Sequence, residues 1–101
     1  MTEQEKAILK RDIYFIADHY GTLGQLNKTL EECTELIAAI AGYLQNRDSR
    51  AHIAEEIADV KVMLTQIEYL LHSEYEVEGM MRYKVDRQLK RIEASKWLQD
   101  I

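Results

Sequence analysis

Apolar residues recur along this chain at intervals of three and four positions rather than two, which is the spacing of amphipathic helices. The sequence contains no proline and only four glycines, so few residues interrupt helical segments. Short polar links separate the periodic segments and favour antiparallel packing of successive helices. We therefore expect an all-α, four-helix antiparallel bundle-like domain, with helices over about residues 3–19, 23–45, 50–72 and 74–98.

Capping boxes mark most of the predicted helix starts. In this motif a Ser or Thr side chain accepts a hydrogen bond from an amide in the first turn, and a Glu or Gln side chain reaches back. Three such pairs precede the first, second and fourth helices: Thr2 with Glu5, Thr22 with Gln25, and Ser73 with Glu76. The third helix follows a polar turn in which Asp48 or Ser49 can act as the N-cap.

The predicted helices carry more apolar surface than one chain of this size is expected to cover. The main apolar face of the second helix contains Leu26, Leu30, Cys33, Ile37, Ile40 and Leu44. The main face of the third helix contains Ile53, Ile57, Val60, Leu64, Ile67 and Leu71, with Met63 and Leu70 about 80–100° away on a second face. We expect a homo-oligomer, either a dimer or a tetramer, to cover the second face.

Two acidic motifs fall on consecutive predicted helices. The first is Glu31-Glu32-x-x-Glu35 and the second is Glu55-Glu56-x-x-Asp59. Each places carboxylates at positions i and i+3, on one side of a helix. Like charges this close repel each other unless a cation lies between them, and Mg²⁺ and Mn²⁺ prefer oxygen ligands.

The flanks that carry these carboxylates become apolar further along each helix, which is not typical of a solvated surface. On the second helix the stripe runs through Gln25, Lys28, Glu32, Glu35, Ala39 and Gly42. On the third helix Glu56 and Asp59 share a flank with Met63 and Leu70. Both acidic pairs lie roughly 9–20 Å from the connecting turn, at 1.5 Å per residue, so a hairpin would bring them to similar levels. Glu31 and Glu55 project elsewhere, toward solvent or into an outer shell.

The fourth helix supplies the opposite charge. Lys84, Arg87 and Arg91 are spaced at i, i+3 and i+7, so they form one basic stripe. Lys and Arg side chains neutralise phosphate oxygens, Arg often through two parallel hydrogen bonds. A basic stripe combined with a metal site is suited to a polyphosphate.

These motifs resemble the pattern of the MazG-like nucleoside triphosphate pyrophosphohydrolases, which belong to the all-α NTP pyrophosphatase superfamily. The family pattern is EExxE followed by ExxD on the next helix, and here it reads Glu31-Glu32-x-x-Glu35 and Glu56-x-x-Asp59. The lead-in from Gly24 to Glu31 and the basic run from Lys84 to Arg91 are also similar. The resemblance covers about residues 22–92.

The resemblance implies metal-dependent hydrolysis of a nucleoside triphosphate between its α- and β-phosphates, giving a monophosphate and pyrophosphate. It implies Mg²⁺, with Mn²⁺ as a substitute, held by Glu32, Glu35, Glu56 and Asp59. Phosphate contacts would come from Lys84, Arg87 and Arg91, and contacts to the base, ribose or phosphate of the substrate from Gln25 and Lys28. As a mechanistic hypothesis, the metal would lower the pKa of a water whose proton passes to Glu35.

Other functions stay open at this stage. The shared motif does not separate a general (d)NTP hydrolase from a phosphoribosyl-ATP pyrophosphohydrolase, and a non-catalytic helical nucleotide-binding or assembly module is a further alternative. A di-iron carboxylate bundle is disfavoured because no Glu is followed three residues later by His. His19, His52 and His72 are expected at the surface or at helix ends, and Cys33 in the core.

Bulk properties limit the remaining classes. At 101 residues the chain is expected to form one domain, residues 1–101. Its net charge of −5 argues against nucleic acid as a partner. One cysteine excludes an internal disulfide, and no apolar run approaches the roughly 20 residues of a membrane helix. The N-terminus lacks the pattern of a signal peptide, so a cytoplasmic location is expected.

Overall fold

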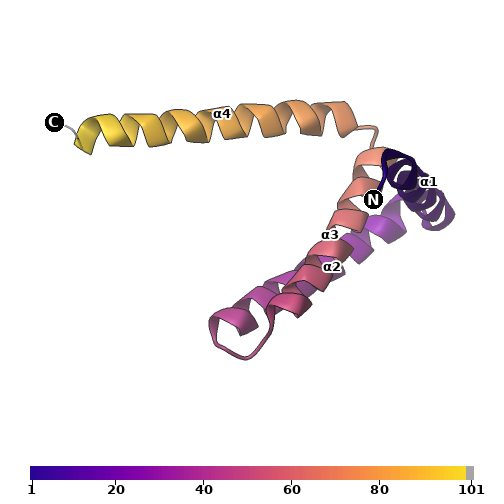
Figure 1. The fold of residues 1–101 in the computed structure, drawn as a ribbon. Coiled ribbons are helices and arrows are strands. Elements are labelled where there is room, and N and C mark those ends of the chain that lie inside the picture. The colour runs from indigo at the N-terminus through magenta and orange to yellow at the C-terminus, as the bar shows by residue number, and fades with distance from the viewer. Residues whose placement is uncertain (100–101) are drawn as a thin grey trace. The chain divides into compact units, whose positions relative to one another are not determined.

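Four helices make up the computed structural model, which describes residues 1–99 (Figure 1). They are α1 (Glu3–Tyr20), α2 (Thr22–Leu44), α3 (Arg50–Leu70) and α4 (Glu74–Gln99), and the described residues contain no strand. The all-α prediction is confirmed, and every predicted helix limit falls within one helical turn of the observed one.

The helix starts follow local hydrogen-bonding chemistry. Thr2 caps α1 as predicted: its Oγ1 accepts from the Glu5 amide at 3.1 Å, and Glu5 Oε1 accepts from the Thr2 amide at 3.3 Å. Ser49 caps α3 by accepting from the His52 amide at 3.1 Å. The fourth helix begins at Glu74, directly after Ser73.

The predicted cap at Thr22 is wrong. Thr22 is the first residue of α2, and Gly21 lies at the junction with φ +82° and no side-chain cap. Glycine suits this position because a positive φ strains residues that carry a Cβ atom. The Gly21 amide also donates to the Ala17 carbonyl at 2.9 Å, so this single residue ends α1 and begins α2.

The chain divides into two compact units, residues 1–71 and residues 72–101, and each is described by itself. In the first unit, α2 and α3 form an antiparallel hairpin closed by a short turn (Figure 1). α1 packs mainly against α3. The Tyr14 and Tyr69 rings stack with centroids 4.0 Å apart, and the Tyr69 hydroxyl donates to Asp18 Oδ2 at 2.8 Å.

The interior of the first unit lies between the carboxylate-bearing flanks of α2 and α3, which corrects the predicted orientation of these helices. The buried residues of this unit are Ile13 and Ala17 on α1 together with Gln25, Glu32, Ala39, Glu56, Met63 and Gln66. The stripe predicted as core on α2 is largely exposed instead, including Leu30, Ile37 and Leu44 at 69%, 67% and 76%, and the stripe on α3 is exposed or half-buried. Helical spacing fixes the angle between two stripes but not which stripe meets the neighbouring helix. Cys33, predicted to be buried, is half-buried.

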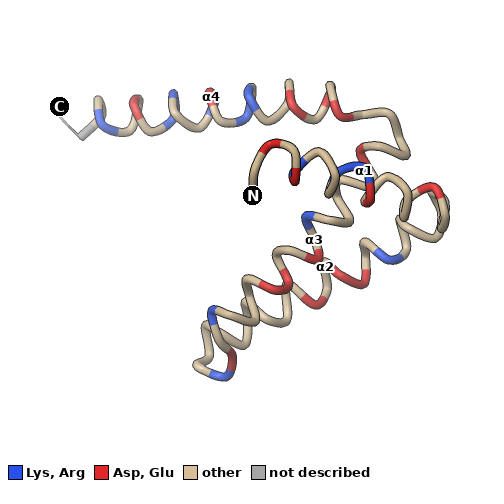
Figure 2. Tube along the Cα trace, turned by 45° about the vertical axis from the view of Figure 1, so that its right-hand side comes forward, with Lys and Arg blue, Asp and Glu red and all other residues tan. Residues whose placement is uncertain are grey.

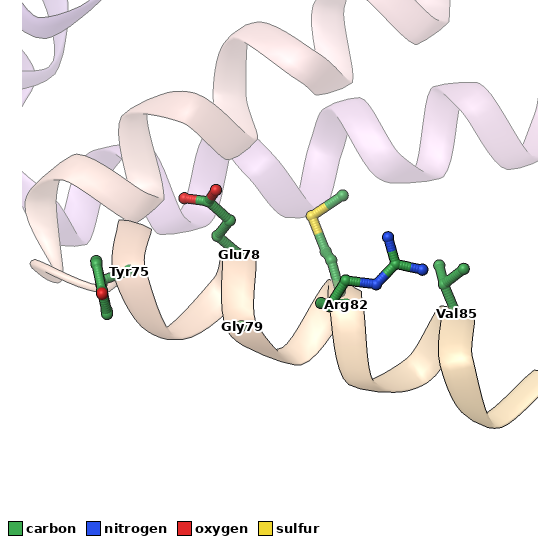
Figure 3. Close-up of a pocket in the computed structure, with 6 residues that line it drawn as sticks. Tyr75, Glu78, Gly79, Arg82 and Val85 are labelled. Carbon is green, nitrogen blue, oxygen red and sulfur yellow. The ribbon is translucent and has the colours of Figure 1, made fainter.

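The second unit is the helix α4, whose first turns carry acidic residues alone and whose remainder carries both basic and acidic residues (Figure 2). Arg82 and Asp86 form an i,i+4 ion pair at 2.8 Å. A shallow pocket near the start of the helix is lined by Tyr75, Glu78, Gly79, Met81, Arg82 and Val85 (Figure 3). None of the predicted site residues lines this pocket.

Candidate metal centre

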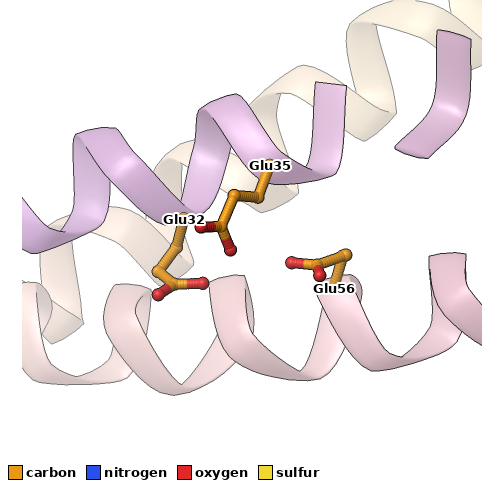
Figure 4. Close-up of side chains that lie close together, drawn as sticks. All are labelled: Glu32, Glu35 and Glu56. Carbon is orange, nitrogen blue, oxygen red and sulfur yellow. The ribbon is translucent and has the colours of Figure 1, made fainter. Parts of the chain in front are cut away.

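Three carboxylates from two helices converge in the middle of the α2–α3 hairpin. Glu32 and Glu35 project from α2 and Glu56 from α3, and all three point into the space between the helices (Figure 4). One oxygen from each lies within 4.8 Å of the others. Oxygens bound to one cation at about 2.1 Å are at most about 4.2 Å apart, so a small side-chain rotation would bring these atoms to coordination distance.

Glu32 and Glu56 are buried, with only 9% and 7% of their surface exposed. The Oε2 atom of each is inaccessible to solvent and has no hydrogen-bond partner. Buried polar atoms almost always have partners, and an unpaired buried carboxylate oxygen is costly. A cation bound by the three carboxylates would give both of these oxygens a partner.

The other oxygen of each buried carboxylate is held by a basic side chain one helical turn earlier. Lys28 Nζ lies 3.3 Å from Glu32 Oε1. His52 Nε2 lies 3.1 Å from Glu56 Oε1. On its far side, the His52 ring contacts Asp48 through Nδ1, at 2.8 Å from each carboxylate oxygen. Both ring nitrogens face carboxylates, an arrangement that favours the imidazolium, and the pKa of His52 is raised chiefly by the hydrogen bond to Asp48.

Glu35 is the exposed member of the group. The negative charge of Glu32 raises the pKa of the Glu35 carboxyl, and burial and the charge of Glu56 add to the effect. A raised carboxyl pKa means that the group disfavours a third negative charge and gains from a proton or a cation. The raised pKa of Glu35 and the unpaired oxygens of Glu32 and Glu56 therefore both point to a place for a cation.

Asp59, predicted as the fourth ligand, lies outside this group among the described residues. It follows Glu56 by one turn of α3, and it is exposed. Glu31 and Glu55 are also exposed, as expected. The structure thus brings together three of the four predicted ligands.

The two predicted substrate contacts on α2 have different surroundings. The Gln25 side chain is buried, and its Nε2 donates to Gln66 Oε1 at 2.6 Å, so this amide links α2 to α3. Lys28 is exposed and lies between Glu31 and Glu32, at 3.6 and 3.3 Å. These ion pairs raise the pKa of Lys28, the hydrogen bond to Glu32 having the largest effect.

The predicted phosphate-binding residues Lys84, Arg87 and Arg91 lie on α4 in the second unit, and all three are exposed. Within the described part of α4, none of them forms an ion pair. The Arg87 guanidinium lies over the Tyr83 ring, 5.7 Å from its centroid. Their part in the site stays a prediction.

Sequence reasoning missed Asp48 and His52 as members of the site. His52 was expected at the surface or a helix end, and its side chain is indeed partly exposed, but it contacts Glu56. The available signal was the spacing Asp48-x-x-x-His52-x-x-x-Glu56, which places His52 one turn before Glu56 on α3 and Asp48 in the turn that precedes the helix. Such i,i+4 spacing is common in helices and becomes informative only beside the acidic motif.

Comparisons with known proteins give no match: no family model, no curated protein and no solved structure resembles the chain significantly. Among the described helices, none has both the length and the apolar character needed to cross a membrane.

Proposed function

We propose that this protein is a metal-dependent hydrolase of nucleoside triphosphates that cleaves between the α- and β-phosphates, releasing a nucleoside monophosphate and pyrophosphate. The observation that carries the proposal is the pair of buried, unpartnered oxygens on Glu32 and Glu56, beside Glu35. The resemblance of the acidic motifs to the MazG-like pattern supplies the reaction.

The donor set fits Mg²⁺ or Mn²⁺. It consists of carboxylate oxygens alone, which these hard cations prefer, and two of those oxygens have no other partner. Glu32, Glu35 and Glu56 would hold the cation, with Asp59 as the proposed fourth ligand. When bound, the cation would supply positive charge toward phosphate oxygens and increase the acidity of water.

The chain's own residues have distinct proposed roles. Glu35 has an exposed carboxylate with a raised pKa, which suits a group that accepts a proton from water. Lys84, Arg87 and Arg91 would neutralise the phosphates and the leaving pyrophosphate. Lys28, which is exposed and contacts Glu32 of the acidic group, is a further proposed phosphate contact. A substrate contact by Gln25 would require its amide to leave Gln66.

We also propose that the protein acts as a homodimer or homotetramer. In the first unit the main apolar face of α2 is largely exposed and that of α3 is exposed or half-buried, and the buried hydrophobic residues among those described are Ile13, Ala17, Ala39 and Met63. Exposed apolar surface on this scale is typical of association sites. The four-helix antiparallel bundle predicted from the sequence belongs to the same proposal.

The test is pyrophosphate release from a panel of NTPs, dNTPs and phosphoribosyl-ATP, measured with Mg²⁺, with Mn²⁺ and with EDTA. Metal-dependent release that is lost in Glu56→Gln but kept in Glu3→Gln, an exposed glutamate on α1, supports the enzyme. A preference for phosphoribosyl-ATP would redefine the substrate. No release from any compound by the folded protein would refute hydrolysis and favour a binding or assembly module.

A further inference from the structure

The hydrogen-bonded chain Asp48–His52–Glu56 is not accounted for by the proposed reaction. It begins in the turn before α3 and ends on a buried carboxylate of the metal centre. We propose that His52 is a positioning residue, which holds Oε1 of Glu56 so that Oε2 is presented to the cation. This inference rests on the proposed metal centre, but it concerns a residue that need not touch metal or substrate.

The anchoring of Asp48 makes the chain of contacts rigid at its outer end. Asp48 Oδ1 accepts from the Ser49 amide at 2.8 Å as well as from His52. Ser49 in turn caps α3 through the His52 amide. Asp48 also packs closely against α2, because a Cβ atom added at Gly42 would lie only 3.1 Å from Asp48 Cβ. The imidazole is therefore held by a residue that is itself fixed between the helices.

The two oxygens of Glu56 have different surroundings, so the contact with His52 occupies one oxygen and leaves the other free. Oε1 accepts from His52 Nε2, whereas Oε2 is buried and has no partner. A glutamate side chain has three rotatable bonds, and a hydrogen bond to one oxygen limits where the other can lie. His52 thus limits the conformations of the Glu56 carboxylate and leaves Oε2 free for a cation.

The same arrangement occurs on α2, which argues against coincidence. Lys28 holds Glu32 Oε1 from one turn earlier, and Glu32 Oε2 is buried without a partner. Both buried ligands are thus approached by a basic residue at i−4, and both leave one oxygen free. Imidazole differs from a lysine amine because it is rigid and is itself held by Asp48.

The experiment compares Mn²⁺ dissociation constants of the full-length protein, obtained from the electron paramagnetic resonance signal of free Mn²⁺. His52→Gln keeps an amide donor close to the position of Nε2, whereas His52→Asn is too short to reach Glu56. Loss of an outer-shell partner typically weakens metal binding 10–100-fold. We expect about this loss in His52→Asn, near wild-type affinity in His52→Gln, and no change in His19→Gln, an exposed histidine on α1.

Helical content and thermal unfolding in EDTA are measured for each variant. Asp48→Asn is a second test, because it keeps the shape of the anchor and removes its charge, and a severalfold weakening is expected. Equal Mn²⁺ affinity in His52→Asn and wild type overturns the positioning role while the metal centre stands. Equal weakening in His52→Asn and His52→Gln also overturns it, since the donor would then be irrelevant. A wild-type protein that binds no Mn²⁺ refutes the metal centre and this inference together.

Discussion

Gln25 and Gln66 share a 2.6 Å hydrogen bond between α2 and α3, and both side chains are buried, at 6% and 2% exposure. This polar contact lies in an interior with few fully buried apolar residues. The pairing of α2 with α3 depends on amides and carboxylates as well as on apolar contacts. The stability of the hairpin is therefore sensitive to any buried polar group that loses its partner.

Replacing Gln66 with leucine should leave the Gln25 amide buried without its acceptor. We expect the free energy of unfolding to fall by about 1–3 kcal/mol, the usual cost of an unsatisfied buried donor. The double variant Gln25→Leu/Gln66→Leu should recover most of the loss, because no polar group is then left unpaired. Urea unfolding of the single and double variants in EDTA measures this, and additive losses would contradict it.

Replacing Glu35 with glutamine should have opposite effects on stability and activity. The raised pKa of Glu35 shows that its negative charge is disfavoured beside Glu32 and Glu56. Without metal, at pH 7, Glu35→Gln should therefore unfold at a higher temperature than wild type, while pyrophosphate release should be abolished. Thermal unfolding in EDTA and a turnover assay with Mg²⁺ test the two halves. Lower stability, or substantial residual turnover, would sink the role assigned to Glu35.

The ion pair between Asp48 and His52 should give the metal-free protein a stability component with defined pH limits. Since the folded pKa of His52 is raised above 6.5, its contribution is complete below that value and is lost as pH rises through the folded pKa. Since the folded pKa of Asp48 is lowered below 3.8, its contribution is complete above that value and is lost as pH falls. The pair should therefore stabilise most between about pH 4 and 6.5.

Urea unfolding in EDTA as a function of pH, for wild type and His52→Asn, isolates this component. The difference in free energy of unfolding between the two proteins should be largest between about pH 5 and 6 and should shrink toward alkaline pH. A constant difference from pH 4 to pH 9 would show that the titration of His52 does not contribute.

The exposed apolar face of α2 should be needed for assembly. Ile37 is 67% exposed, and Ile37→Glu places a charge on that face without entering the interior of the first unit. We expect this variant to sediment as a monomer, with reduced stability because the face is no longer covered. Gln4→Glu, at an exposed polar position in the first turn of α1, should leave the oligomer intact. Sedimentation velocity distinguishes the species, and a monomeric wild type would refute the oligomer.

The sequence predicts the helices well because their limits are local. The Thr2 capping box and the Ser49 cap depend on residues within one turn, so they can be identified without tertiary information. The rotation of α2 about its own axis, by contrast, depends on contacts with residues of α3 that are distant in the sequence. Leu30 and Ile37 look like core because they are apolar, yet the hairpin closes on the flank that carries Ala39 and Glu32.

The candidate site likewise has features that the sequence predicts and features that it does not. The convergence of Glu32, Glu35 and Glu56 follows from motif spacing plus a hairpin, both of which the sequence indicates. The position of Asp59 does not follow, because residues three apart differ by about 60° around a helix, and spacing alone does not show which of the two lies in the interface. The contact from His52 to Glu56 depends on which rotamers meet across one turn, and residue spacing alone does not determine this.

The repulsion among the three carboxylates also has a consequence for motion. It acts between α2 and α3, in the part of the hairpin where Glu32 and Glu56 are buried. Without a cation, this segment should open locally more often than with a cation bound, and backbone amides around Glu32 and Glu56 should then exchange their hydrogens faster. Cation binding should slow that exchange, so the protection of these amides would report site occupancy independently of turnover.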